Sequence, residues 1–178
     1  MSCAFSVADE HPDLDDDRDP RAAGFDFLYG EWDVHHRYLA RRLCGSADWL
    51  EFEGTMTCRP VLGGRGNVDE FRMPSRGARG ATVRLFDPDA GRWSLHWASS
   101  LTGRFEPPVA GGFESGRGVF EGDDVFEGRP VRVRYVWDRI AEDGARWRQS
   151  LSPDAGETWE ENWVMAFRRV GRRGGPEL

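Results

Sequence analysis

Short segments in which apolar and polar residues alternate run through most of this chain, and Gly, Pro and Asp separate one segment from the next. No window of a dozen residues carries a convincing 3.6-residue apolar period, so the pattern predicts strands rather than helices. Only residues 25–29 suggest a helical turn, directly before the first strand. The predicted strands, about ten in number, cover residues 31–42, 48–59, 67–73, 81–86, 92–99, 109–114, 118–123, 130–138, 146–151 and 158–168.

The connections between these segments favour antiparallel pairing. Residues 87–91 (DPDAG) and 152–156 (SPDAG) each supply Pro, Asp and a Gly able to adopt positive φ, as tight hairpin turns require. Sequential hairpins build an up-and-down sheet, and closing that sheet leaves no exposed edge. The predicted fold is therefore all-β: an antiparallel up-and-down barrel of about ten strands with a short N-terminal helical turn.

Charge is distributed unevenly along the 178 residues, whose net charge is -7. Residues 1–24 carry seven acids against two arginines, whereas the remainder is nearly neutral. We therefore expect a disordered acidic tail over residues 1–24, one barrel domain over residues 25–169 and a flexible C-terminal tail over residues 170–178. No basic face is implied, which argues against a nucleic-acid partner.

Several classes of protein are excluded by what the sequence lacks. No apolar stretch approaches the ~18 residues of a membrane span, and residues 1–24 do not read as a signal peptide. The three cysteines, Cys3, Cys44 and Cys58, form no C-x-x-C pair, so neither a disulfide framework nor a cysteine-rich zinc site fits. Lysine is absent, which excludes Schiff-base catalysis. We expect a cytoplasmic monomer or homodimer without a membrane partner.

The segment 25–34 (FDFLYGEWDV) places Gly30, Glu31 and Trp32 at the start of the first predicted strand, after the helical turn. This Gly-x-Trp resembles the opening of lipocalin and calycin barrels. From about residue 25 to residue 168 the chain more closely resembles an uncharacterised bacterial family of lipocalin-like barrels, a domain of unknown function. The matching stretches are FEGT at 52–55, LGG at 62–64, GNVDEF at 66–71, RLFDP at 84–88 and NW at 162–163. The resemblance implies a lipocalin-like barrel and no established activity.

A second motif lies in the last predicted hairpin. Ser152, Asp154, Gly156, Thr158 and Trp159 spell S-x-D-x-G-x-T-W, which is similar to the Asp-box of sialidases. In that setting the motif ties a hairpin turn and carries no chemistry. Because a single copy without propeller repeats argues against a sialidase, we expect a turn held by its own side chains.

Alternate residues of a strand face opposite sides, so the more apolar set of each strand predicts the interior. For residues 67–73 this rule is ambiguous, because the set containing Glu70 competes with the set containing Phe71. Elsewhere the predicted inward residues are Trp32, Val34, His36, Tyr38, Leu50, Phe52, Met56, Cys58, Ala81, Val83, Leu85, Trp93, Leu95, Trp97, Val131, Val133, Tyr135, Trp137, Trp147, Gln149, Leu151, Trp159, Glu161, Trp163 and Met165.

This interior predicts a wide aromatic cavity with a few polar groups, which is how small-molecule sites are built. The alternative is that eight tryptophans simply fill the barrel. Our leading hypothesis is the binding of a small apolar or aromatic molecule. The predicted ligand-binding residues are His36, Tyr38, Trp97, Tyr135, Gln149, Glu161 and Trp163.

Catalysis stays open at this point. A cofactor-independent isomerase, cyclase or lyase of a biosynthetic pathway would use His36 as base with Glu70 as its partner. No metal site is expected, because the adjacent His35 and His36 face opposite sides of a strand and His96 is predicted outside. Haem held by one axial histidine, His36 or His96, is a further alternative by analogy with other barrels. An interaction protein is the weakest class, since no long apolar surface is visible.

Overall fold

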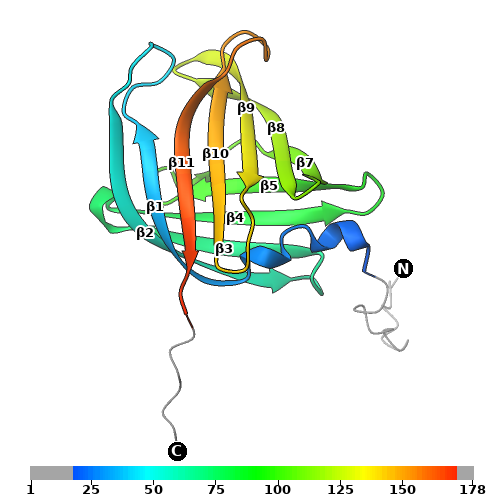
Figure 1. The fold of residues 1–178 in the computed structure, drawn as a ribbon. Helices are drawn as coiled ribbons and strands as arrows, with labels where there is room; N and C mark the ends of the chain where they lie inside the picture. The colour runs from blue at the N-terminus through cyan, green and yellow to red at the C-terminus, as the bar shows by residue number, and fades with distance from the viewer. Residues whose placement is uncertain (1–17, 172–178) are drawn as a thin grey trace, which may run out of the picture.

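The computed structural model describes residues 18–171, in which an antiparallel barrel follows two short 3-10 turns (Figure 1). The turns are η1 (Pro20–Ala23) and η2 (Asp26–Leu28), and a third, η3 (Pro74–Arg76), joins two strands. The strands are β1 (Gly30–Leu39), β2 (Trp49–Val61), β3 (Gly66–Met73), β4 (Ala78–Asp87), β5 (Arg92–Ser99), β6 (Arg104–Phe105), β7 (Val109–Glu114), β8 (Arg117–Phe126), β9 (Arg129–Asp138), β10 (Gly144–Ser152) and β11 (Glu160–Arg169).

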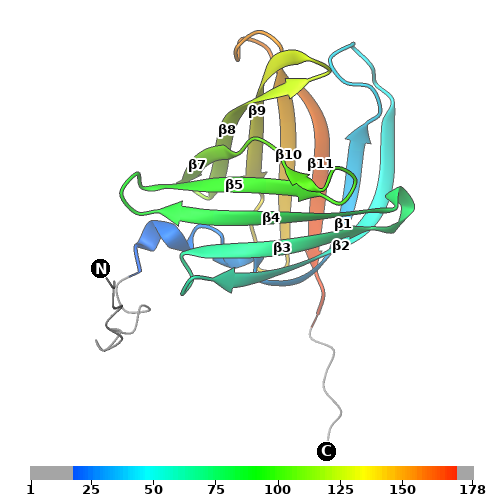
Figure 2. The same ribbon diagram turned by 180° about the vertical axis from the view of Figure 1, so that it is seen from behind.

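Ten of the strands close into one barrel. Each pairs with its neighbour in the chain, β5 pairs with both β4 and β7, and β1 pairs with β11 to complete the ring. The two-residue β6 adds to β5 as an extra strand that the sequence did not indicate. The expected up-and-down barrel of about ten strands with an N-terminal helical turn is confirmed. Strands β3 to β5 run across the direction of β9 to β11 on opposite walls (Figures 1 and 2).

One arginine fastens the ends of the seam between β1 and β11. The guanidinium of Arg169 lies 4.1 Å from the ring centre of Trp32. Its two Nη atoms donate to the carbonyl oxygens of Phe27 and Tyr29, each at 2.6 Å. Gly30 makes the bend from η2 into β1 with φ of 112°, a conformation that favours glycine. The Gly-x-Trp segment is therefore held by the last strand of the barrel.

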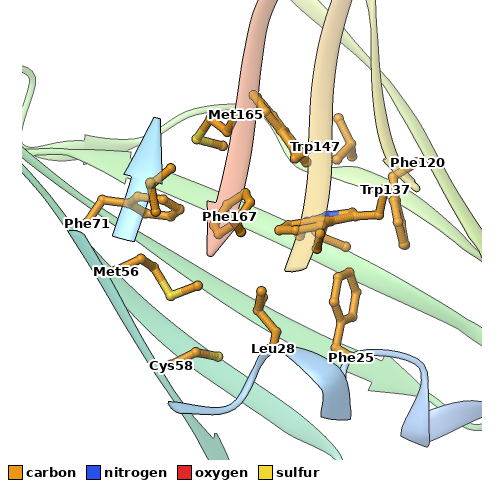
Figure 3. Close-up of a cluster of buried hydrophobic side chains, with 14 of the residues drawn as sticks. Phe25, Leu28, Met56, Cys58, Phe71, Phe120, Trp137, Trp147, Met165 and Phe167 are labelled. Atoms are coloured by element: carbon orange, nitrogen blue, oxygen red, sulfur yellow. The ribbon is translucent and has the colours of Figure 1, made fainter. Parts of the chain in front are cut away.

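The N-terminal turns close one end of the barrel. Phe25 and Leu28 project from them against Trp137 and Phe167, and both are fully buried (Figure 3). Trp32 Nε1 donates to the carbonyl oxygen of Leu28 at 2.9 Å. These contacts bury an aromatic cluster where an open barrel end would admit water. No helix among residues 18–171 is long and apolar enough to cross a membrane.

The predicted boundary of the N-terminal tail is wrong by several residues. Residues 18–24 were expected in the disordered segment, yet η1 forms there and Ala22 is fully buried. Arg18 forms an ion pair with Asp26 at 2.7 Å, and the Trp93 indole donates to the Arg21 carbonyl at 3.2 Å. Residues 1–17 and 172–178, which hold the rest of both predicted tails, lie outside the described residues.

The inward face of β4 is the opposite of the predicted one. Thr82, Arg84 and Phe86 point inside, whereas Ala81, Val83 and Leu85 are only half-buried. The reason is the buried ion pair of the Arg84 Nη2 and Asp69 Oδ2, 2.5 Å apart. Because a buried charge needs a partner, the paired guanidinium overrides the apolar pattern of its own strand.

The hairpin between β10 and β11 has the expected internal tie. Ser152 Oγ donates to Asp154 Oδ1 at 2.7 Å and accepts from the Gly156 backbone N–H at 2.8 Å. Asp154 also accepts the Thr158 backbone N–H at 2.8 Å, and Trp159 Nε1 donates to the Gly156 carbonyl at 2.9 Å. Hydrogen bonds from the Thr158 hydroxyl, the Thr158 backbone N–H and the Ser152 hydroxyl lower the pKa of Asp154 to about 2. The motif is structural.

Removing one ring of the closed end tests its importance. We expect Phe25→Ala to lower the free energy of unfolding by about 3–5 kcal/mol, because the variant leaves a cavity between packed aromatic rings. Urea unfolding followed by tryptophan fluorescence measures the change. The matched control is Phe105→Ala, whose side chain is 59% exposed and whose loss should change stability little. Equal midpoints for the two variants would contradict this role of the turns.

Candidate functional site

The barrel encloses a cavity of about 280 Å³ above the closed end. Its wall is mostly apolar, is rich in aromatic side chains and contains residues from eight strands. The aromatic members are His36, Tyr38, Phe52, Phe71, Trp97, Tyr135, Trp137, Trp147 and Trp163. Since protein interiors are normally packed without voids of this size, an aromatic cavity of this volume has the form of a small-molecule site.

The cavity opens at the end of the barrel opposite η1 and η2. Strand β1 starts beside η2 and runs toward the opening, where Tyr38 and then Arg42 follow each other along the wall. The rim also includes Arg76 in η3 and three exposed residues after β5, namely Leu101, Thr102 and Glu106. A ligand would enter between these residues and reach the aromatic wall beneath them.

His36 belongs to the cavity wall, but its nitrogens do not face an open position. Trp163 Nε1 donates to His36 Nδ1 at 3.2 Å, which places the ring proton on Nε2 because an indole nitrogen can only donate. The ring stacks on Phe52 with centroids 4.5 Å apart. Its Nε2 lies 2.9 Å from the point where a Cβ on Gly54 would stand, so the missing side chain leaves room for the imidazole. His36 therefore holds Trp163 in place.

Burial keeps the His36 ring neutral. It lowers the pKa of His36 to about 4, with a smaller contribution from the neighbouring His35. A group with so low a pKa is a weak base, which removes a proton from a substrate poorly near neutral pH. The acid–base role predicted for His36 has little support in this environment.

Trp163 lies at the centre of the aromatic wall. Its ring packs edge-to-face against Tyr38, Trp97 and Trp147, with centroid distances of 5.2, 6.3 and 5.7 Å. Tyr135 lies beside Trp147 at 4.9 Å, and burial raises the pKa of its hydroxyl. Tyr38, Trp97, Tyr135 and Trp163 line the cavity as the sequence indicated.

The predicted cavity residue Glu161 is outside. Strands β10 and β11 pair Gln149 with Trp163 but Ser150 with Glu161, so Asn162 is an extra residue in a β-bulge. The bulge turns Asn162 inward, where its Oδ1 accepts from Gln149 Nε2 at 2.9 Å. Glu161 instead pairs with Arg148 at 3.2 Å on the outer face. A strict alternation through the bulge gives the wrong face for Glu161.

Glu70 is also outside, which corrects its predicted pairing with His36. On β3 the inward set is Asn67, Asp69, Phe71 and Met73. Glu70 is exposed and forms an ion pair with Arg79 at 2.6 Å. The buried Asp69 accepts the Thr82 backbone N–H at 2.8 Å, and this pairing selects the face that the sequence left ambiguous.

Sequence reasoning missed several members of the wall. Phe71, Met73, Thr82 and Arg84 come from β3 and β4, the two strands whose faces were ambiguous or misassigned. Asp69 and Arg84 are opposite charges in neighbouring predicted strands, and that complementarity was the available signal. Both Nη atoms of Arg84 are engaged within the protein, because Nη1 also donates to Asn67 Oδ1 at 2.9 Å.

Two further arginines stand at the rim, close to the ring of Tyr38. Arg42 lies 4.4 Å from the ring centre of Tyr38, and Arg76 lies 5.4 Å from the same centre. Neither forms an ion pair within 4.0 Å inside residues 18–171, although Glu106 lines the same rim. Burial lowers the pKa of Arg42. Both cations rest on aromatic faces rather than on opposite charges.

The described histidines do not fit haem or a metal centre. His36 Nδ1 accepts from Trp163, and its Nε2, which has no hydrogen-bond partner, is packed against Gly54. His35 contacts Glu53 at 2.7 Å on the outer face, and His96 contacts Ser94 Oγ at 3.2 Å. None of them therefore presents an axial ligand to the cavity. Across residues 18–171, no three His, Cys, Asp or Glu side chains are grouped closely enough to hold a metal ion.

Comparison with known proteins leaves the chain without a family. No family model matches the sequence, and no curated protein matches it. One similar solved structure is a protein of unknown function from the DUF3598 family of Nostoc punctiforme PCC 73102, with a TM-score of 0.44 and 12% sequence identity. The match covers 82% of this chain and 48% of that one, so this chain spans about half the length of the matched protein. This similarity assigns neither a family nor a function.

The environment of His36 predicts an unusual titration. We expect NMR of ¹⁵N-histidine-labelled protein to show the Nε2–H tautomer of His36 at pH 7 and a neutral ring down to about pH 4. Because the unfolded chain binds this proton below about pH 6.5, the free energy of unfolding should fall as pH drops from 6.5 to 4, by up to roughly 3 kcal/mol from this group. The His36→Gln variant identifies the signal. A midpoint near 6.5 would contradict the neutral, buried ring.

Proposed function

We propose that the chain is a lipocalin-like binding protein that takes a small, largely apolar or aromatic molecule into its barrel. The observation that carries this proposal is the cavity of about 280 Å³ whose wall is mainly apolar and rich in aromatic side chains. That volume lies just below the roughly 300–1,000 Å³ typical of ligand pockets, which favours a ligand of one or two rings. Edge-to-face packing of Trp163 with its neighbours leaves aromatic surfaces for such a ligand to contact.

The polar groups of the wall support orientation of a ligand. Gln149 donates a hydrogen bond to Asn162, and the hydroxyl-bearing rings of Tyr38 and Tyr135 line the same cavity. Catalysis has weaker support, because Glu70 lies on the opposite side of the barrel wall from His36. The proposed function is therefore binding without turnover.

Filling the cavity with a side chain of the protein itself tests the proposal. We expect naphthalene to bind the wild-type protein at one site, measured by titrating the protein into naphthalene in a calorimeter. Ser99 lines the cavity on β5, so Ser99→Trp should occupy part of it and weaken binding by at least about tenfold.

The control lies on the same strand. Ser94 belongs to the outward set of β5, so Ser94→Trp makes the same change on the other face and should bind naphthalene as the wild type does. Absence of saturable naphthalene binding, or equal affinity in the two variants, would overturn binding inside the barrel.

A further inference from the structure

We infer that the ligand carries one carboxylate, held at the rim of the cavity by Arg42 and Arg76, while its apolar or aromatic body fills the space beneath. This inference rests on the proposed function and names the class of ligand: a small aromatic or apolar monocarboxylic acid.

The first argument is that the arginines of the cavity wall differ in whether they form an ion pair within the protein. Three arginines line the cavity. Arg84 is buried with Asp69 at 2.5 Å and Asn67 at 2.9 Å, so its charge is already balanced within the protein. Arg42 and Arg76 have no such partner among residues 18–171, and they alone leave guanidinium charge available to a ligand.

The second argument is where these two cations stand. Arg42 follows β1 and Arg76 ends η3, yet both guanidiniums lie over the ring of Tyr38, at 4.4 and 5.4 Å from its centre. Arg42 also lies 5.6 Å from the ring centre of Phe126, and Arg76 lies 5.6 Å from that of Phe52. Two like charges are thereby brought to one ring, an arrangement that an anion between them stabilises.

The third argument is that the net charge and the lining of the cavity suit an apolar monocarboxylic acid. Among residues 18–171 only one acid lines the cavity, Glu106 at the rim, so the lining residues with unbalanced charge carry two positive charges and one negative. The remaining charge suits a monoanion. A carboxylate also fits the planar fork of arginine in a bidentate manner. The wall beneath is aromatic, which requires the rest of the ligand to be apolar.

Glu106 limits the affinity for an anion. Although Glu106 is exposed as a residue, desolvation of its carboxyl and the nearby Asp124 raise its pKa, against a smaller lowering by Arg42. Its carboxylate would repel a bound acid, so replacing it with a neutral amide should strengthen the binding of an anionic ligand.

A matched pair of probes tests the inference on the full-length protein. 2-Naphthoate and 2-acetylnaphthalene have nearly the same shape, but only the first carries a charge. We expect naphthoate to bind more tightly, and its affinity alone to fall as sodium chloride is raised. Arg42→Gln and Arg76→Gln should each weaken naphthoate roughly fivefold or more and leave the neutral ketone within about twofold. Glu106→Gln should strengthen naphthoate only.

The control for charge is Arg41→Gln. Arg41 neighbours Arg42 in the same loop, but it is exposed, forms an ion pair with Asp48 at 2.9 Å and does not line the cavity. It should leave both affinities unchanged. Equal affinity of the two probes, or equal loss of both in the Arg42 and Arg76 variants, would overturn the carboxylate site while leaving binding in the barrel intact. If neither probe binds, the proposed function itself fails and this inference fails with it.

Discussion

Arg169 holds the seam at which the barrel closes, and the site depends on the register of that seam. Its guanidinium lies on Trp32 and binds two carbonyls of the N-terminal segment, so the first and last strands are fastened at the closed end. Farther along the seam, Tyr38 of β1 lies opposite Trp163 of β11. A shift of one residue would turn every side chain of β1 to the other face. The seam therefore brings His36, Tyr38 and Trp163 to one wall.

The interior is stabilised by polar groups that are either paired or neutral. Arg84 and Asp69 satisfy each other beneath the cavity, where an isolated charge would be costly. His36 avoids that cost by staying uncharged and accepting the hydrogen bond of Trp163. Because Arg84 is paired with Asp69, its charge is already balanced, unlike that of the arginines at the rim. Among residues 18–171, the cavity-lining arginines without an ion pair are Arg42 and Arg76, which both lie over the ring of Tyr38.

The barrel has a packed core at its closed end and a cavity toward its open end. Below, Phe25 and Leu28 join the core and exclude water from the strands (Figure 3). Above them the packing gives way to a cavity that the aromatic side chains surround without filling. An apolar cavity with positive charge at its rim suits an amphipathic ligand. The proposed binding function concerns the apolar body of that ligand, and the proposed carboxylate site concerns its charged end.

Local patterning was enough to predict most of the fold and about half of the site. Alternation and turn residues depend on neighbours in the chain, so strands such as β1 and β9, the Asp154 turn and the inward Tyr38 and Trp97 could be read directly. The inward face of β4, the bulge at Asn162 and the burial of Ala22 could not. Each depends on a partner distant in sequence: Asp69 for Arg84, Gln149 for Asn162, and the barrel end for η1. The sequence by itself determined an antiparallel barrel with an aromatic interior. Only the tertiary structure decided which side chains face the cavity and how much space they leave, because pairing between strands and the packing of their side chains set both.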